Sequence, residues 1–83
     1  MHIIELVRYV APGERDTNVI AKFNVQVSDD LRLYGLKLVN TSNGRRTYFP
    51  SVGGGNRLAS ASVPLARKIT ELASRAAYEQ GVA

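Results

Sequence analysis

The sequence has no cysteine and no tryptophan, and it has one histidine and one methionine among its 83 residues. Without cysteine there can be no disulfide and no thiolate metal ligand, and a single histidine excludes a histidine-rich zinc site. A chain of this length forms one domain and buries only a little over ~60% of its unfolded surface. We therefore expect a single domain over residues 1–83, without metal or cofactor, that gains buried surface as a homodimer.

Long apolar runs and a strong excess of one charge are also missing. No segment approaches the roughly 20 apolar residues of a membrane span, and residues 1–5 lack the features of a signal peptide. We expect a cytoplasmic protein without a membrane partner. Eleven Lys and Arg against seven Asp and Glu give a net charge of +4, which favours acidic partners but is small for a nucleic-acid-binding protein.

Alternating apolar residues predict an antiparallel sheet. We expect strands at about residues 3–10, 18–28, 31–40 and 45–50, and a fifth if residues 57–61 add a short one. The clearest alternation places on one face Val19, Ala21, Phe23, Val25 and Val27. Ile20 and Lys22 fall on the opposite, mostly hydrated face.

The turns and one irregularity can also be located. Leu31 and Leu33 alternate out of phase with Leu36 and Leu38, and a β-bulge at Tyr34-Gly35 would bring all four leucines to one side. Short polar side chains predict a turn at residues 28–30. Asn43-Gly44 predicts a hairpin with a type I′ turn, because both residues readily adopt positive φ.

A helical period begins near Pro64. We expect an amphipathic helix over about residues 64–80 that ends at Gly81 and docks through Leu65, Ile69, Leu72 and Ala76. The predicted fold class is therefore α+β, an antiparallel β-meander of four to five strands followed by one C-terminal amphipathic α-helix.

Several short motifs between Ser28 and Tyr78 occur in a characteristic order. They are Leu31-Arg-Leu-Tyr-Gly-Leu-Lys-Leu-Val-Asn40, Asn43-Gly44, Tyr48-Phe49-Pro50-Ser51, Pro64 and Lys68-Ile69. In this order and spacing the chain resembles the stage V sporulation protein G (SpoVG) family. The resemblance implies a small sheet-plus-helix subunit that dimerises through strand contacts and binds DNA or RNA as a regulator.

Basic residues and one tyrosine are the candidate nucleic-acid contacts. Lys68 is the basic family position that this chain retains, and the other candidates are Arg45, Arg46, Arg57, Arg67 and Tyr48. Tyr48 should share a face with Arg46, opposite Thr47 and Phe49. Arg67 and Arg75 lie at i,i+4 spacing from Glu71, so intrahelical ion pairs on a hydrated face are the alternative for both arginines.

Other functions have less support in the sequence. The glycine run in residues 51–56 lacks the Gly-Lys-Ser/Thr of a P-loop and is better explained as a flexible linker. His2 stands alone, and a turn accounts for Asp29-Asp30, so we expect no enzyme and no small-molecule ligand. The alternative to nucleic-acid binding is a protein-interaction or structural module of the same fold. Val52-Gly53 favours it, because the family has Lys-Arg there.

Overall fold

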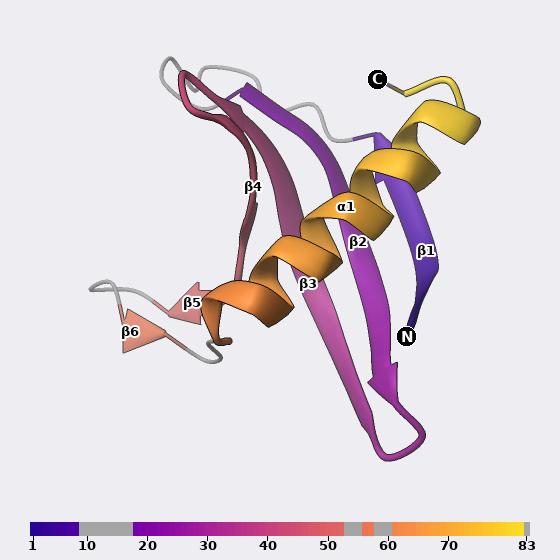
Figure 1. The fold of residues 1–83 in the computed structure, drawn as a ribbon, viewed down its shortest axis with the longest axis vertical. Coiled ribbons are helices and arrows are strands. Elements are labelled where there is room, and N and C mark those ends of the chain that lie inside the picture. Colours follow the sequence, from indigo (N-terminus) through magenta and orange to yellow (C-terminus); the bar gives the residue numbers. More distant parts are fainter. Residues whose placement is uncertain (9–17, 53–55, 58–60, 83) are drawn as a thin grey trace.

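The computed structural model describes residues 1–8, 18–52, 56–57 and 61–82. Along the chain the elements are β1 (His2–Arg8), β2 (Asn18–Ser28), β3 (Leu31–Thr41), β4 (Gly44–Tyr48), β5 (Ser51–Val52), β6 (Asn56–Arg57) and α1 (Val63–Glu79). The first four strands form one antiparallel sheet in sequence order, with α1 across it (Figure 1). The predicted α+β class, a meander followed by one C-terminal helix, is confirmed.

The short strand expected at residues 57–61 is wrong in its extent. Asn56–Arg57 form β6, which pairs with β5 in a separate two-stranded sheet. Ala61 already belongs to the segment that leads into α1, and residues 58–60 lie outside the described part of the chain. Pro50 explains why the chain leaves the main sheet after Tyr48, since proline has no N–H to donate to a ladder. Residues 9–10 of the first expected strand also lie outside the described residues.

The bulge predicted in β3 is confirmed. Opposite Asn24 of β2, β3 has two residues, Tyr34 and Gly35. Gly35 has a φ of +75° and donates its N–H to Oδ1 of Asn24 at 3.0 Å. Because of the extra residue, Leu33 packs against the core and Leu36 is fully buried, although their spacing is odd.

A second irregularity, in β2, makes the prediction for Ile20 wrong. The register shifts between Val19 and Ala21, which leaves Ile20 as an extra residue in β2. Its side chain packs against the core instead of facing water. The alternation of apolar residues is a property of one strand, whereas a bulge depends on how that strand pairs with its partner. The sequence of β2 alone therefore did not show the bulge at Ile20.

The β3–β4 hairpin turns one residue earlier than predicted. Thr41 pairs with Gly44, so that Ser42 and Asn43 form the turn. Gly44 has a φ of +107° and Asn43 has no positive φ, whereas a type I′ turn needs positive φ at both central residues. Thr41 Oγ1 accepts the N–H of Asn43 at 3.2 Å and donates to the carbonyl of Gly44 at 2.6 Å. These two bonds stabilise the observed turn.

Both ends of α1 are fixed by local bonds. Ser62 caps the N-terminus by accepting the N–H of Leu65 on its hydroxyl at 3.4 Å. Gly81 terminates the helix as predicted, with a φ of +73°. The N–H of Val82 then bonds the carbonyl of Ala77 at 2.8 Å, and the Val82 side chain packs against the core.

The buried stripe of α1 is rotated slightly from the predicted one. Its fully buried residues are Ile69, Ala73 and Ala77, at i, i+4 and i+8. Leu65 and Ala76 pack beside them as expected, but Leu72 is only half-buried and lies outside the core cluster. The small side chains of Ala73 and Ala77 on this stripe allow the helix backbone to lie close to the sheet.

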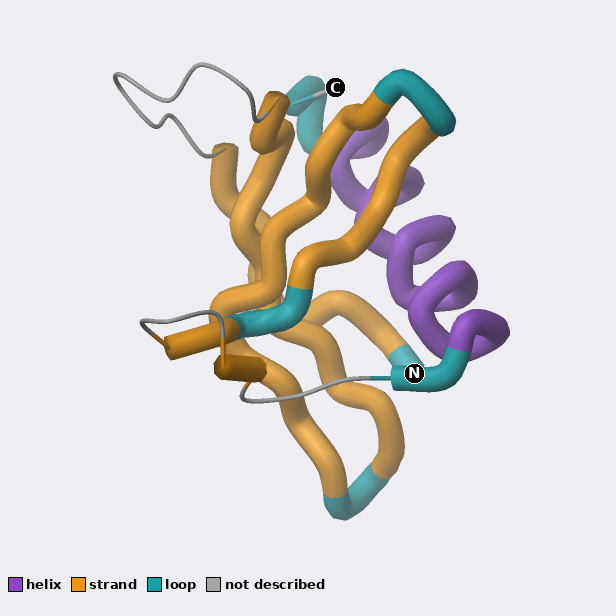
Figure 2. Tube along the Cα trace, turned by 90° about the vertical axis from the view of Figure 1, so that its left-hand side faces the viewer, coloured by secondary structure: helices purple, strands orange, loops and turns teal. Residues whose placement is uncertain are grey.

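The helix covers one face of the four-stranded sheet. It runs diagonally from β4 to β1, and Figure 2 shows it along one side of the strands. The sheet residues buried in the core with it are Leu6, Ala21, Phe23, Val25, Leu36 and Leu38. None of the described helical residues lies on the other face, which we call the helix-free face. The described residues include no helix with the length and apolar character to cross a membrane.

Candidate nucleic-acid interface

A row of four side chains crosses the helix-free face from edge to edge. Val7 of β1 pairs with Lys22 of β2, and Lys22 pairs with Lys37 of β3. Lys37 in turn pairs with Tyr48 of the edge strand β4. Directly opposed residues of antiparallel strands project from one face, and their neighbour Leu36 is buried beneath α1. We call these four residues the Lys22–Lys37 row.

Two exposed tyrosines and an arginine accompany the row. Tyr48 is 46% exposed and Tyr34 is 59% exposed. Arg46 lies two residues before Tyr48 in β4, so both are on the same face, as the sequence predicted. Phe23 is buried and Phe49 packs against the core. The tyrosines, and not the phenylalanines, are therefore the aromatic rings open to a partner.

A shallow depression lies at the Gly35 bulge and is lined in part by residues of the row. The depression has a volume of about 470 Å³, and Glu5, Val7, Lys22 and Tyr34 line it. A Cβ atom added to Gly35 would lie 3.8 Å from Cε of Lys22, so the lysine side chain passes over the glycine. Lys22 and Tyr34 thus line the same depression on the helix-free face, with Glu5 as the acidic residue beside them.

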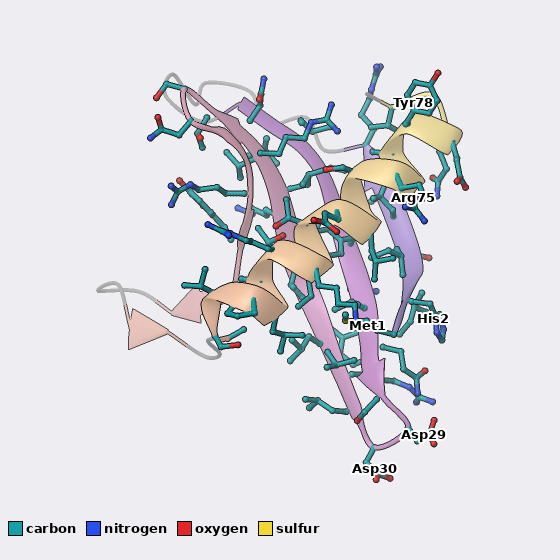
Figure 3. All side chains as sticks on the ribbon, in the orientation of Figure 1. Met1, His2, Asp29, Asp30, Arg75 and Tyr78 are labelled. Atoms are coloured by element: carbon teal, nitrogen blue, oxygen red, sulfur yellow. The ribbon has the colours of Figure 1, made fainter. Side chains whose placement is uncertain are left out.

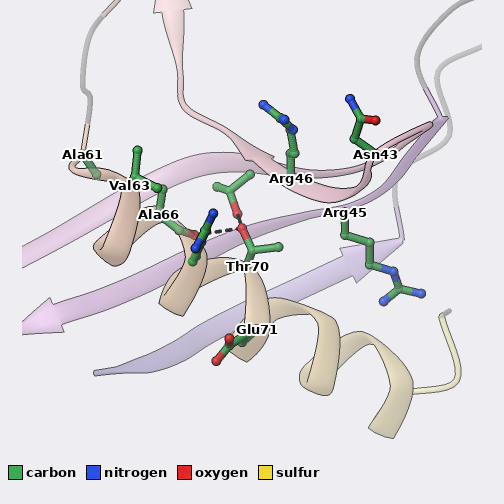
Figure 4. Close-up of a pocket in the computed structure, with 10 residues that line it drawn as sticks. Asn43, Arg45, Arg46, Ala61, Val63, Ala66, Thr70 and Glu71 are labelled. Carbon is green, nitrogen blue, oxygen red and sulfur yellow. Dashed lines mark hydrogen bonds between the residues drawn. The ribbon is translucent and has the colours of Figure 1, made fainter.

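A second candidate surface is a groove between β4 and the first half of α1, which we call the β4–α1 groove (Figure 4). Its volume is about 570 Å³, and its charged lining residues are Arg45, Arg46, Arg67 and Glu71. Figure 4 shows Arg45 and Arg46 extending to opposite sides of β4. This follows from their adjacent positions in the strand.

Two threonines form the floor of the groove. Thr70 Oγ1 donates to the carbonyl of Ala66 at 2.8 Å. Its only hydroxyl proton is then used, so the 2.7 Å bond between the two hydroxyls takes its proton from Thr47. This chain of bonds, dashed in Figure 4, holds the edge strand to the helix.

The predicted contact residues do not gather on one surface. Tyr48 belongs to the row, Arg45 and Arg67 line the β4–α1 groove, and Arg46 lies beside both. Lys68 is exposed on α1 and is not among the groove residues. For Arg57 the backbone is described in β6, but its side chain lies outside the described part of the structure.

The intrahelical ion pairs considered for the α1 arginines are not formed within the described residues. Arg67 and Arg75 are exposed, and in this part of the chain neither forms an ion pair with Glu71 or Glu79. Figure 3 shows Arg75 and Tyr78 on the outer side of α1. The same view shows Asp29 and Asp30 at the tip of the β2–β3 hairpin, where the predicted turn is confirmed.

Two lysines that sequence reasoning did not select lie at the centre of the helix-free face. Alternation placed Lys22 on the hydrated face, and Lys37 sits between the buried Leu36 and Leu38. These signals give the face of each lysine but not the pairing between them. The pairing depends on the register of β2 against β3, which the bulges shift.

Neither a metal-binding group among the described residues nor a matching protein adds information about the two surfaces. Within the described residues no group of His, Cys, Asp and Glu could hold a metal ion. In comparisons with known proteins, no family model, no curated protein and no solved structure matches this chain. The candidate contacts on the two surfaces are the lysines, tyrosines and arginines described above.

Proposed function

We propose that this chain binds single-stranded nucleic acid on its helix-free face. The observation that carries the proposal is the direct pairing of Lys22 with Lys37 at the centre of the sheet. This pairing brings two positively charged side chains to the same face of neighbouring strands. Phosphates bound beside them would release counterions from the nucleic acid.

The exposed tyrosines supply the second component of such a site. Tyr48 ends the row at the β4 edge and Tyr34 borders the central depression. Stacking of a base on an aromatic side chain contributes about 1–3 kcal/mol and tolerates any sequence. Single strands are the better ligand, because the bases of a duplex are already stacked on each other.

The oligomeric and regulatory parts of the proposal rest on the resemblance to the SpoVG family. In the described sheet β1 has one neighbour, β2. Its outer edge can pair with β1 of a second copy, which is an ordinary way to protect an exposed strand edge. A two-fold axis perpendicular to the sheet would then join the two helix-free faces into one continuous surface.

An oligonucleotide titration at two salt concentrations tests the binding mode. Labelled single-stranded DNA, single-stranded RNA and duplex DNA of mixed sequence are compared. We expect both single strands to bind more tightly than the duplex. Lys22→Gln should reduce the log–log salt slope by about 1, and Tyr48→Ala should weaken binding by about 1–3 kcal/mol.

Two helix variants serve as matched comparisons. Arg75→Gln removes one positive charge on the outer side of α1 and should leave the affinity nearly unchanged. Lys68→Gln tests the helix contact that the family resemblance implies, and a loss there equal to that of Lys22→Gln would move the site to the helix. Absence of binding at low salt would overturn the proposal. Together with an intact dimer by light scattering, it would favour the protein-interaction module.

A further inference from the structure

We propose that the β4–α1 groove is a separate binding site for an extended acidic peptide, which adds to the edge of β4 as a fifth strand. The site is distinct from the proposed nucleic-acid surface, because its central residues are Arg45, Arg67 and Thr70. Arg46 borders both surfaces and is left out of the tests for that reason.

The backbone of β4 is the first component of the site. In the sheet order, β4 pairs with β3, and no described strand lies along its other edge. The outward N–H and C=O groups of an edge strand are a template for an added strand. An extended peptide bound in this way gains main-chain hydrogen bonds from the strand and specificity from the adjoining groove.

Strand β4 and helix α1 are joined to each other by side-chain hydrogen bonds before any ligand binds. The hydroxyl of Thr47 in β4 donates to Thr70 of α1 at 2.7 Å, and Thr70 donates to the carbonyl of Ala66. Helix and edge strand are therefore fixed at one spacing. Since both hydroxyl protons are used in these bonds, the remaining polar donors toward a ligand are the arginines, the side-chain amide of Asn43 and the strand backbone.

The charge of the lining selects an acidic ligand. Arg45 and Arg67 lie on the helix side of β4 and Arg46 on its other side, with Glu71 as the acidic residue among them. Arginine binds carboxylates through two parallel hydrogen bonds, which are about twice as strong as neutral ones. Val63, which is 64% exposed at the same groove, adds an apolar contact for an aliphatic side chain.

A second copy of the chain fits this edge poorly. Isologous pairing of two β4 edges would place the same arginines of both copies against one another. Like charges in such positions destabilise a strand pair, and the chain as a whole carries a net charge of +4. An acidic segment of another protein is therefore the better occupant.

The test uses a fluorescein-labelled peptide of about ten residues in which pairs of glutamates alternate with pairs of valines. Because strand side chains alternate between faces, each face then carries both residue types. We expect the full chain to bind this peptide. Arg45→Gln and Arg67→Gln should each weaken binding roughly tenfold, and Lys22→Gln should have no effect. That control separates a failure of this site from a failure of the nucleic-acid surface.

Strand addition has its own signature. A proline at the centre of the peptide removes a backbone donor and should weaken binding at least roughly tenfold. The bound peptide should also slow amide hydrogen exchange in β4. Equal binding of the proline peptide, or of a peptide with lysine in place of glutamate, would overturn the proposal. So would displacement of the peptide by an oligonucleotide, or a change in oligomeric state caused by Arg45→Gln.

Discussion

The two faces of the main sheet are built by the same four strands but carry different chemistry at their centres. Beneath α1, Phe23 and Leu36 are almost completely removed from water. One residue away along the same strands, Lys22 and Lys37 project from the helix-free face beside Tyr48. The contrast teaches that stability and binding are separated by the alternation of each strand. Substitutions of the core residues beneath α1 should change the free energy of unfolding, and substitutions of the exposed residues of the Lys22–Lys37 row should change affinity.

The largest effect is expected from Phe23→Ala. Phe23 is 2% exposed and belongs to the core cluster with Leu36 and Ile69. Truncating a buried phenylalanine costs about 3–5 kcal/mol, which is a large share of the roughly 5–15 kcal/mol that stabilises a typical domain. Urea unfolding followed by circular dichroism would measure the change in the free energy of unfolding.

Tyr48→Ala is the matched truncation on the helix-free face. It removes an aromatic ring that is 46% exposed, and its cost in the free energy of unfolding should be below about 1 kcal/mol. If the two truncations were equally destabilising, the helix-free face would be part of the structural core and the division between the faces would fail.

An intermediate effect is expected at the bulge, which keeps the two faces in phase. Gly35→Ala places a Cβ on a residue with a φ of +75°, at an expected cost of about 1–2 kcal/mol. The added atom would meet Cε of Lys22 only at 3.8 Å, so backbone strain, and not crowding, should dominate. Gly35→Asn should lose less, because asparagine tolerates positive φ. Equal losses by chemical denaturation would point to the Lys22 contact instead.

The same bulge shows how far the sequence predicts the fold. The phase jump between Leu33 and Leu36 is visible within one strand, and it correctly located the extra residues. The sequence shows no phase jump at Ile20, because every second residue from Val19 through Val27 is apolar without interruption. The turn lies at Ser42-Asn43, one residue before the predicted Asn43-Gly44. Hydrogen bonds of the Thr41 side chain stabilise the observed turn, and the preference of Asn-Gly for a type I′ turn does not include them.

The candidate site was less predictable than the fold. Charge and exposure can be read along the chain, and they selected Arg45, Arg67 and Lys68. Which charges meet is decided by strand register and by the direction of α1 across the sheet. The Lys22–Lys37 pair depends on the shifts that the bulges introduce, and the β4–α1 groove depends on a helix that begins 15 residues after β4 ends.

The smallest effect, and the one that most sharpens the contrast between the faces, is expected for Lys22→Gln. Lys22 is exposed, so removing its charge should change the free energy of unfolding by less than about 0.5 kcal/mol. The same variant should bind single-stranded nucleic acid more weakly, because a phosphate contact is lost. Core substitutions such as Phe23→Ala should instead lower the free energy of unfolding. A stable Lys22→Gln protein with unchanged affinity would show that the paired lysines do not serve binding, and a fall in stability would show that Lys22 makes a structural contact.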